Sequence, residues 1–206
     1  MKKLVTVLVA SAVLSGATFA KTWTNHIGAG LGVPVESIKP DDGDGIFQAV
    51  VMFDATYIVV HENGFTAKAG IDSGALASDD VKIQDDDTNA RPFAAFNLGA
   101  GYSFVRTEKV LFGATGMFSF AFNQYEDDVK IAGKKYTNSL SIGAFGLGAD
   151  VFGSFNFTEH FGLYANLGVR YLFAGIVKSE IADVKDDTDV KGTVAVLPSL
   201  GVMWKF

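Results

Sequence analysis

Apolar and polar residues alternate with a period of two along most of the chain beyond residue 24. The clearest run is Phe161 to Phe173, thirteen residues in which every odd-numbered position is apolar. A period of two is typical of a β-strand with one apolar face, because successive side chains point to opposite sides. At about 3.3 Å per residue and a tilt near 40°, such a strand rises about 33 Å, more than an apolar lipid band of about 25 Å. The strand is therefore long enough to cross a membrane.

The same alternation predicts eight strands. Besides Phe161 to Phe173, six segments have an apolar face in clear phase: Ile27 to Val33, Phe47 to Val59, Phe65 to Ile71, Phe96 to Phe104, Phe112 to Phe122 and Val194 to Phe206. In the remaining segment, Leu140 to Phe155, the phase blurs around Gly146 and Gly148 and stays open. Because Pro198 has no N–H for a strand ladder, we expect a β-bulge there.

The segments between the predicted strands alternate between short and long. The short ones span 61–64, 106–109 and 156–160, and the long ones 35–45, 75–90, 123–138 and 175–191. This pattern predicts an all-β fold, a transmembrane antiparallel up-and-down barrel with short periplasmic turns, long extracellular loops and both mature termini in the periplasm.

A short sequence echo occurs in the predicted long loops. DDVKI at Asp79 to Ile83 recurs at Asp127 to Ile131, with weaker copies at Asp183 and Asp189. Either these pieces are strand extensions above the lipid, or the echo is a coincidence within acidic loops.

The first twenty residues have the pattern of a secretory signal peptide. Lys2 and Lys3 precede an apolar stretch from Leu4 to Leu14, and small residues lead to Ala20. The apolar stretch is shorter than the roughly 20 residues of a spanning helix, so we expect cleavage after Ala20 rather than an anchor. Residues 21–206 are then a single barrel domain.

The face opposite the apolar one distinguishes a membrane barrel from a soluble lipocalin-like barrel. It is rich in glycine, which suits the narrow interior of an eight-stranded barrel better than a water-facing exterior. Large aromatic residues lie on the apolar face, as in the aromatic girdles of membrane barrels. The interfacial aromatics that we expect are Trp23, Tyr57, Tyr102 and Tyr171, with Trp204 in the last strand.

Five charged residues fall on the glycine-rich face and are expected inside the barrel: Asp54, Lys68, Asp72, Asp150 and Arg170. A buried charge needs a partner, so the two cations are expected to pair with carboxylates, with the pairing left open. The cluster is either a satisfied polar core or a salt-bridge gate that switches.

Composition narrows the possible functions. The formal charge is −6, and 15 basic against 23 acidic residues remain without Lys2 and Lys3, so nothing favours nucleic acid as a partner. The absence of cysteine excludes a disulfide scaffold and a thiolate metal site. The acidic run Asp41 to Gly45 lacks the ligand spacing and closing Glu of an EF-hand. We expect the acidic runs to be solvated loops, with weak cation bridging to anionic lipid as the alternative. We therefore expect no metal site and no cofactor.

Catalysis is not expected either. His26, His61 and His160 all fall at the predicted periplasmic end, away from the outer leaflet where a Ser–His site would meet envelope substrates.

The last residues carry the most specific resemblance. Leu200, Val202, Trp204 and Phe206 alternate and finish on an aromatic residue, similar to the C-terminal signal read by the barrel-assembly machinery, and Asn156 to Phe173 is similar to a penultimate hairpin. The chain resembles the small eight-stranded outer-membrane barrels, the class of OmpX, OmpW and the membrane domain of OmpA. The resemblance implies an outer-membrane location, with membrane lipid and the assembly machinery as partners.

These patterns predict a monomeric, non-enzymatic outer-membrane barrel with acidic extracellular loops, which serves envelope integrity or surface interaction with an extracellular ligand. The alternative, implied by the likeness to OmpW, is a narrow channel for small or hydrophobic solutes. A general porin is excluded because an eight-stranded interior is just wide enough for side chains.

Deletion of Phe206 is predicted to block assembly, because the terminal aromatic residue is part of the assembly signal. Unfolded protein should accumulate in the periplasm, measured as loss of the heat-modifiable band after fractionation. Normal yields of that band from the deletion variant would contradict the signal.

Overall fold

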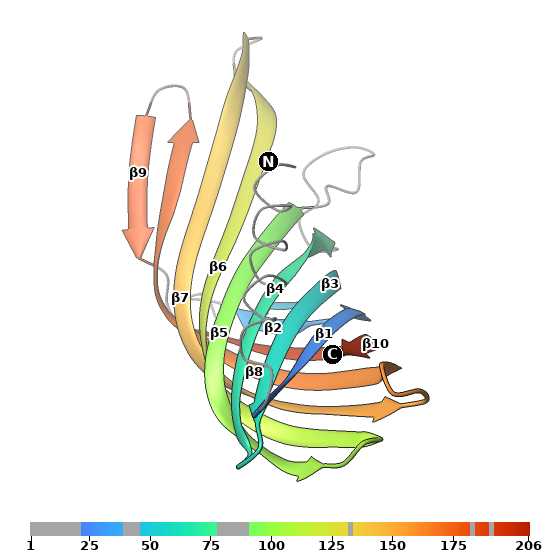
Figure 1. The fold of residues 1–206 in the computed structure, drawn as a ribbon. Helices are drawn as coiled ribbons and strands as arrows, with labels where there is room; N and C mark the ends of the chain where they lie inside the picture. The colour runs from blue at the N-terminus through green and yellow to red at the C-terminus, as the bar shows by residue number, and fades with distance from the viewer. Residues whose placement is uncertain (1–21, 39–45, 78–90, 132–133, 182–183, 190–191) are drawn as a thin grey trace.

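The computed structural model describes residues 22–38, 46–77, 91–131, 134–181, 184–189 and 192–206, so the predicted signal peptide lies outside the described part. The described residues form strands and connections only (Figure 1). The strands are β1 (Trp23–Gly32), β2 (Val35–Ile38), β3 (Ile46–His61), β4 (Phe65–Ala77), β5 (Arg91–Arg106), β6 (Val110–Ile131), β7 (Lys134–Asn156), β8 (Phe161–Ile181), β9 (Val184–Asp189) and β10 (Thr193–Lys205).

These strands close into an eight-stranded antiparallel barrel. Consecutive strands pair from β3 to β8, β8 pairs with β10, and β1 pairs with both β10 and β3. β1 and β2 occupy one position in the barrel, because both pair with β3 and β10 in the same register. β9 pairs with β8 alone and lies outside the closed ring. The predicted fold class and the number of barrel strands are confirmed.

The expected bulge at Pro198 is wrong. β10 pairs with β8 without a register shift, and Pro198 lies opposite Leu167. The irregularity is instead a break between β1 and β2, at Val33 and Pro34. Neither proline has an N–H, and in register Val33 faces Pro198 while Pro34 faces Leu197. The two missing N–H donors, at neighbouring levels of the sheet, interrupt the hydrogen bonds between the strands. The register is the same on both sides of the break, so this is not a bulge.

Bulges occur at two other places. Phe104 is the extra residue where β5 pairs with β6, and Phe173 is the extra residue where β8 pairs with β7. The second bulge lies beside Phe145 and Gly146, where the sequence left the phase of the strand open. The structure assigns that phase: Ala144, Asp150 and Phe152 are buried and point inward.

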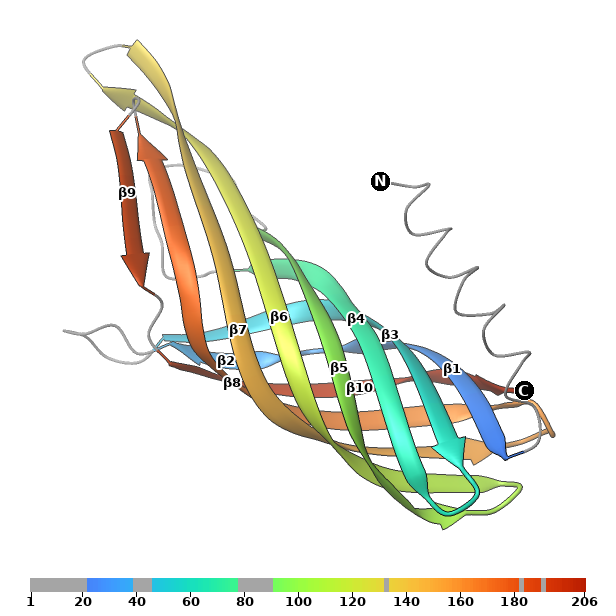
Figure 2. The same ribbon diagram turned by 60° about the vertical axis from the view of Figure 1, so that its left-hand side comes forward.

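One side of the barrel is much taller than the other. β6, β7 and β8 have 22, 23 and 21 residues, whereas β4 and β10 have 13 each. Figures 1 and 2 show β6 to β9 rising as a sheet beyond the ends of the other strands. We name this extension, residues 124–131, 134–141, 175–181 and 184–189, the projecting sheet.

The projecting sheet corrects two of the predicted loops. Residues 123–138 are mostly paired strand, with Gln124 opposite Ser141 and Ile131 opposite Lys134. Much of 175–191 is also strand, in β8 and β9. The copy of DDVKI at Asp127 to Ile131 is therefore a strand extension, as one of the two interpretations expected. The copy at Asp79 to Ile83 lies outside the described residues.

The opposite end of the barrel has three short turns, as predicted: Glu62–Gly64, Thr107–Lys109 and Phe157–His160. Gly64 has a φ of 98°, a left-handed conformation that glycine adopts without strain. The two ends of the described chain meet at this turn end, where Asn25 and Phe206 exchange backbone hydrogen bonds of 3.1 and 3.0 Å.

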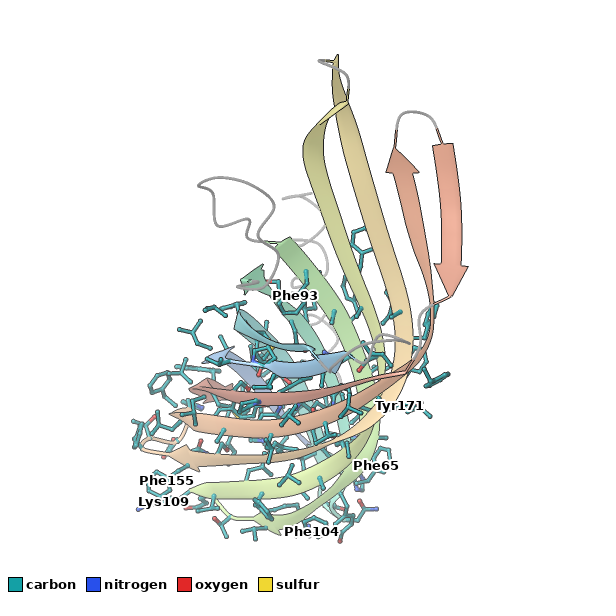
Figure 3. All side chains as sticks on the ribbon, turned by 180° about the vertical axis from the view of Figure 1, so that it is seen from behind. Phe65, Phe93, Phe104, Lys109, Phe155 and Tyr171 are labelled. Atoms are coloured by element: carbon teal, nitrogen blue, oxygen red, sulfur yellow. The ribbon has the colours of Figure 1, made fainter. Side chains whose placement is uncertain are left out.

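The exterior of the barrel is apolar and the interior polar. The exposed large residues include Leu31, Phe96, Leu98, Leu147 and Leu200, and the buried ones include sixteen polar or charged side chains. Figure 3 shows the side chains projecting from the barrel around Phe65, Phe104, Phe155 and Tyr171. An apolar exterior around a polar interior is the reverse of a water-soluble protein and suits a barrel wall in contact with lipid. No helix among the described residues is long and apolar enough to span a membrane.

Leu167→Arg is predicted to destabilise the barrel by about 2–4 kcal/mol, because Leu167 is exposed on the exterior near half height, where arginine meets the lipid midplane. Urea unfolding in lipid vesicles measures the change. Thr22→Arg, at an exposed position at the turn end, is the matched control and should cost about 1 kcal/mol or less. Equal effects would contradict the lipid-facing assignment.

Candidate functional site

The five charged residues expected inside the barrel are all buried, with 7% exposure or less. Asp54 lies on β3, Lys68 and Asp72 on β4, Asp150 on β7 and Arg170 on β8. Each stands at a position whose neighbours along the strand face outward, so strand alternation alone directs them inward.

Asp150 is the centre of this ion cluster. Its Oδ2 accepts a hydrogen bond from Lys68 Nζ at 2.6 Å, and its Oδ1 accepts one from Arg170 Nη1 at 2.5 Å. Room for the three groups comes from Gly168, opposite Asp150 on β8, where a Cβ would lie 2.7 Å from Asp150 Oδ1. One carboxylate therefore contacts both cations.

The cluster joins opposite walls of the barrel. β4 lies three positions from β7 and four from β8 around the ring of eight, so Lys68 reaches across the lumen to Asp150 on β7. Lys68 Nζ also donates to Asn166 Oδ1 on β8 at 2.8 Å. From the other side, Arg170 Nε lies 3.4 Å from Asn97 Oδ1 on β5. The lumen is bridged at this level by hydrogen-bonded side chains.

The other two carboxylates contact neutral donors rather than the cations. Asp54 Oδ2 accepts a hydrogen bond from Ser199 at 2.7 Å, and Asp72 Oδ2 accepts one from Asn97 Nδ2 at 2.7 Å. Asp54 and Asp72 are directly opposite each other on β3 and β4. Of the three carboxylates proposed as partners of Arg170, the structure therefore brings only Asp150 into contact with it.

A layer of apolar side chains lies between the ion cluster and the turn end. Ile58, Val60, Leu111, Phe152, Tyr164 and Met203 form one buried cluster, which we name the apolar plug. Lys68 Nζ lies 5.6 Å from the ring centroid of Phe152 and 5.9 Å from that of Tyr164. These cation–π contacts connect the two layers.

Little space remains around the ion cluster. The cavity between Asp54, Lys68, Asp72, Asp150 and Arg170 has a volume of about 10 Å³. A cavity needs roughly 10–15 Å³ to hold one water molecule. The interior at this level is therefore a packed polar core rather than an open passage.

Four neutral residues complete the network, and their contacts with the charged groups were not expected from the sequence. Asn97, Asn166, Ser119 and Ser199 supply hydrogen bonds that join the charged groups, and Ser119 donates to Asn97 at 2.6 Å. The sequence places each of them on the inward-facing side of its strand, which is the signal that could have found them. Which of them meet across the barrel depends on the stagger of the strands, which alternation does not give.

The predicted interfacial aromatics lie on the exterior. Trp23 packs edge-on against His61, with ring centroids 4.7 Å apart, and Trp204 stacks on His160 at 5.5 Å. Tyr57 donates to Asn25 Oδ1 at 2.8 Å, and Tyr102 and Tyr171 are exposed. The four residues of the expected assembly signal, Leu200, Val202, Trp204 and Phe206, are also exposed on the exterior.

The three histidines gather at the turn end, where all of them line one open cavity. Within the described ranges, no group of three His, Asp or Glu side chains is arranged to hold a metal ion. The ion cluster and the histidines are therefore separate features, with the apolar plug between them.

The chain has the fold of the small eight-stranded outer-membrane β-barrels. A major outer membrane protein of Thermus thermophilus is similar with a TM-score of 0.62 and 14% identity, covering 89% of this chain and 99% of that one. The outer membrane protein OprG of Pseudomonas aeruginosa gives a TM-score of 0.50 and 12% identity, covering 90% and 97%. No protein-family model matches, and no curated protein is detectably similar in sequence.

Asp150→Asn is predicted to destabilise the barrel by on the order of 3 to 5 kcal/mol, because it leaves two buried cations without their carboxylate. Urea unfolding in detergent micelles measures the loss. Arg170→Met should cost less, since Asp150 keeps Lys68, and combining the two substitutions should recover part of the loss from Asp150→Asn.

Asp54→Asn is the matched control. It removes a buried carboxylate that faces another carboxylate and contacts no cation at salt-bridge distance among the described residues, so its cost should be small. An equal loss from Asp54→Asn and Asp150→Asn would show that Asp150 is not the centre of the cluster.

Proposed function

We propose that this chain is a non-enzymatic outer-membrane barrel whose packed interior makes it a scaffold, and whose projecting sheet serves surface interaction outside the cell. The observation that carries the proposal is the contrast between the two parts. The cavity at the ion cluster has a volume of only about 10 Å³, whereas the strands on one side continue far beyond the barrel.

The packed interior favours a scaffold over a narrow channel. A solute would have to displace both the bridge between Lys68 and Asp150 and the six side chains of the apolar plug. Separating a buried ion pair is costly, because each charge is left without solvent or partner. The interior is thus a satisfied polar core in this proposal, rather than a gate.

The projecting sheet favours surface interaction. At about 3.3 Å per residue and a tilt near 40°, the 22 residues of β6 rise about 55 Å, far more than the lipid band of about 25 Å. Among the described pairings, residues 124–131 of β6 pair with β7 alone, and β9 pairs with β8 alone. Such strand edges present backbone N–H and C=O groups that can pair with a strand of another molecule.

The signal-peptide pattern and the short turns support an orientation with the turn end in the periplasm. The signal-peptide pattern of residues 1–20 favours export, and the short turns lie at the end where Trp23 and Phe206 stand. Short turns in the periplasm and long extensions outside are usual for bacterial outer-membrane barrels. The histidines then face the periplasm, which supports a non-enzymatic role at the cell surface.

Replacing Gln124 to Ser141 with Asn-Gly is predicted to remove the surface function and leave the barrel intact. Asn123 and Ile142 are paired, so a two-residue turn can close the hairpin there. Producing cells should lose attachment to surfaces and to one another, while the heat-modifiable band stays. If attachment is unchanged but detergent resistance falls, the chain serves envelope integrity instead.

Trypsin added to intact cells tests the orientation with an internal control. Cleavage is expected at Lys130, Lys134 and Lys135, at the tip of the hairpin between β6 and β7, and not at Lys109 in a short turn. Cleavage at Lys109 alone would show that the turn end, and not the projecting sheet, faces the outside of the cell. That result would contradict the proposal.

A further inference from the structure

The projecting sheet ends in two edge strands. Its strand order is β6, β7, β8 and β9, and among the described pairings residues 124–131 of β6 pair with β7 alone and β9 pairs with β8 alone. Figures 1 and 2 show this sheet beyond the ends of the other strands. An edge strand carries a row of unpaired backbone N–H and C=O groups, so each edge can accept one more strand. Which strand it accepts depends on the residues that pairing would bring opposite each other.

The sequence of the β6 edge is complementary in charge to its own copy. Residues opposite each other in a sheet lie on the same face, so a symmetric antiparallel pair is centred on one residue, which lies opposite its own copy. Centring the pair on Val129 places Asp128 opposite Lys130 in both directions. Centring it on Glu126, Asp127 or Asp128 places that acidic residue opposite its own copy, and centring it on Lys130 places lysine opposite lysine. Because like charges opposite each other are destabilising, the register centred on Val129 is favoured.

The β9 edge has no comparable register from Lys185 onward. A symmetric pair centred on any of its four charged residues places like charges opposite each other: Lys185, Asp186, Asp187 and Asp189. Centring the pair on Thr188 places Asp187 opposite Asp189 in both directions. Charged residues commonly protect edge strands in this way. The β9 edge therefore resists pairing with its own copy, whereas the β6 edge permits it.

The direction of β6 decides in which membrane the second copy lies. β6 runs from the turn end to the tip of the projecting sheet, so two copies in one membrane run in the same direction and can pair only in parallel (Figure 2). A parallel pair brings residues of similar number side by side, and therefore brings the acidic residues 126–128 of the two copies together. An antiparallel pair needs a second β6 that runs the opposite way, from a membrane that faces the first. The favoured register thus belongs to chains in two opposed membranes.

We propose that the β6 edge of this chain binds the β6 edge of a second copy in an opposing membrane, by antiparallel pairing centred on Val129. The contact is symmetric, because each copy contributes the same residues, as is usual in homodimers. It joins the two projecting sheets into one continuous sheet. The inference rests on the proposed surface function and names another copy of the chain as its partner. Because residues 127–131 form only a short pair, adhesion depends on many such contacts between the two membranes.

The test uses phosphatidylcholine vesicles that carry the folded chain, prepared as two populations with different lipid dyes. Fluorescence microscopy then measures the fraction of clusters that contain both dyes. We expect such clusters when both populations carry the unmodified chain, and none when one population is free of protein. Absence of clusters between chain-bearing vesicles would overturn the proposal, as would equal clustering with protein-free vesicles, which would show attraction to lipid.

An exchange of charges tests the register. Asp128→Lys and Lys130→Asp should each abolish clustering within one population, because each substitution places like charges opposite each other twice. Mixing the two variant populations should restore clusters with both dyes, since the two substitutions are complementary in the proposed register. If both variants give the heat-modifiable band of a folded barrel and their mixture does not cluster, the proposal is overturned.

Asp186→Lys is the matched control, because it makes the same change of charge on the β9 edge. Its clustering should equal that of the unmodified chain, and a loss equal to that of Asp128→Lys would show non-specific attraction and overturn the proposal. Replacing Gln124 to Ser141 with Asn-Gly keeps the test valid if a single variant fails to fold. This replacement removes the β6 edge and should abolish clustering, so clusters that persist with it would also overturn the proposal.

This inference and the proposed function can fail separately. The vesicles test pairing between copies of the chain, whereas the hairpin replacement in producing cells tests any surface role of the projecting sheet. If the vesicles do not cluster but the replacement still removes attachment of cells to surfaces, the projecting sheet has a different partner. That result would overturn the inference and leave the proposed function standing.

Discussion

The hydrogen-bonded contact of Asp150 with both Lys68 and Arg170 is the interaction on which the rest of this barrel depends. Two cations on opposite walls are held by one carboxylate, so the strands that carry them are joined across the lumen as well as around the ring. In an interior with little water, such a contact stabilises only if every group is satisfied. Asn166 and Asn97 contribute to that requirement, because Asn166 Oδ1 accepts from Lys68 Nζ and Asn97 Oδ1 accepts from Arg170 Nε.

The apolar exterior and the polar interior depend on each other, because both are set by the same alternation along the strands. Because strand alternation sends every second residue to each side, a slip of one residue would move Arg170 into lipid and the neighbouring Val169 and Tyr171 into the lumen. Burial of the charges inside and contact of the apolar residues with lipid outside therefore both favour the same pairing register of the strands. The two phenylalanine bulges fit this constraint, because Phe104 and Phe173 are both exposed on the exterior.

The sequence was sufficient for the eight barrel strands, for the faces of seven of them and for the inward position of the five charges, since each of these depends only on alternation along a strand. It was insufficient for the contacts between them. That Lys68 reaches Asp150 while Asp54 and Asp72 face each other depends on the stagger between strands, which no single strand records. The projecting sheet was underestimated because acidic composition reads as loop, whereas pairing with a neighbouring strand outweighs composition in β6 and β7. The break at Pro34 was missed because it depends on two prolines, Pro34 and Pro198, that lie on different strands.

Single-channel recording in planar lipid bilayers tests the central claim, that the interior is a packed core, most directly. The unmodified chain should give no steady conductance, because the ion cluster and the apolar plug both close the lumen. Combining Asp150→Ala with Phe152→Ala removes a group from each layer and should produce measurable steps if the chain still folds. A steady, ion-selective conductance from the unmodified chain would contradict the account and identify the lumen as a channel.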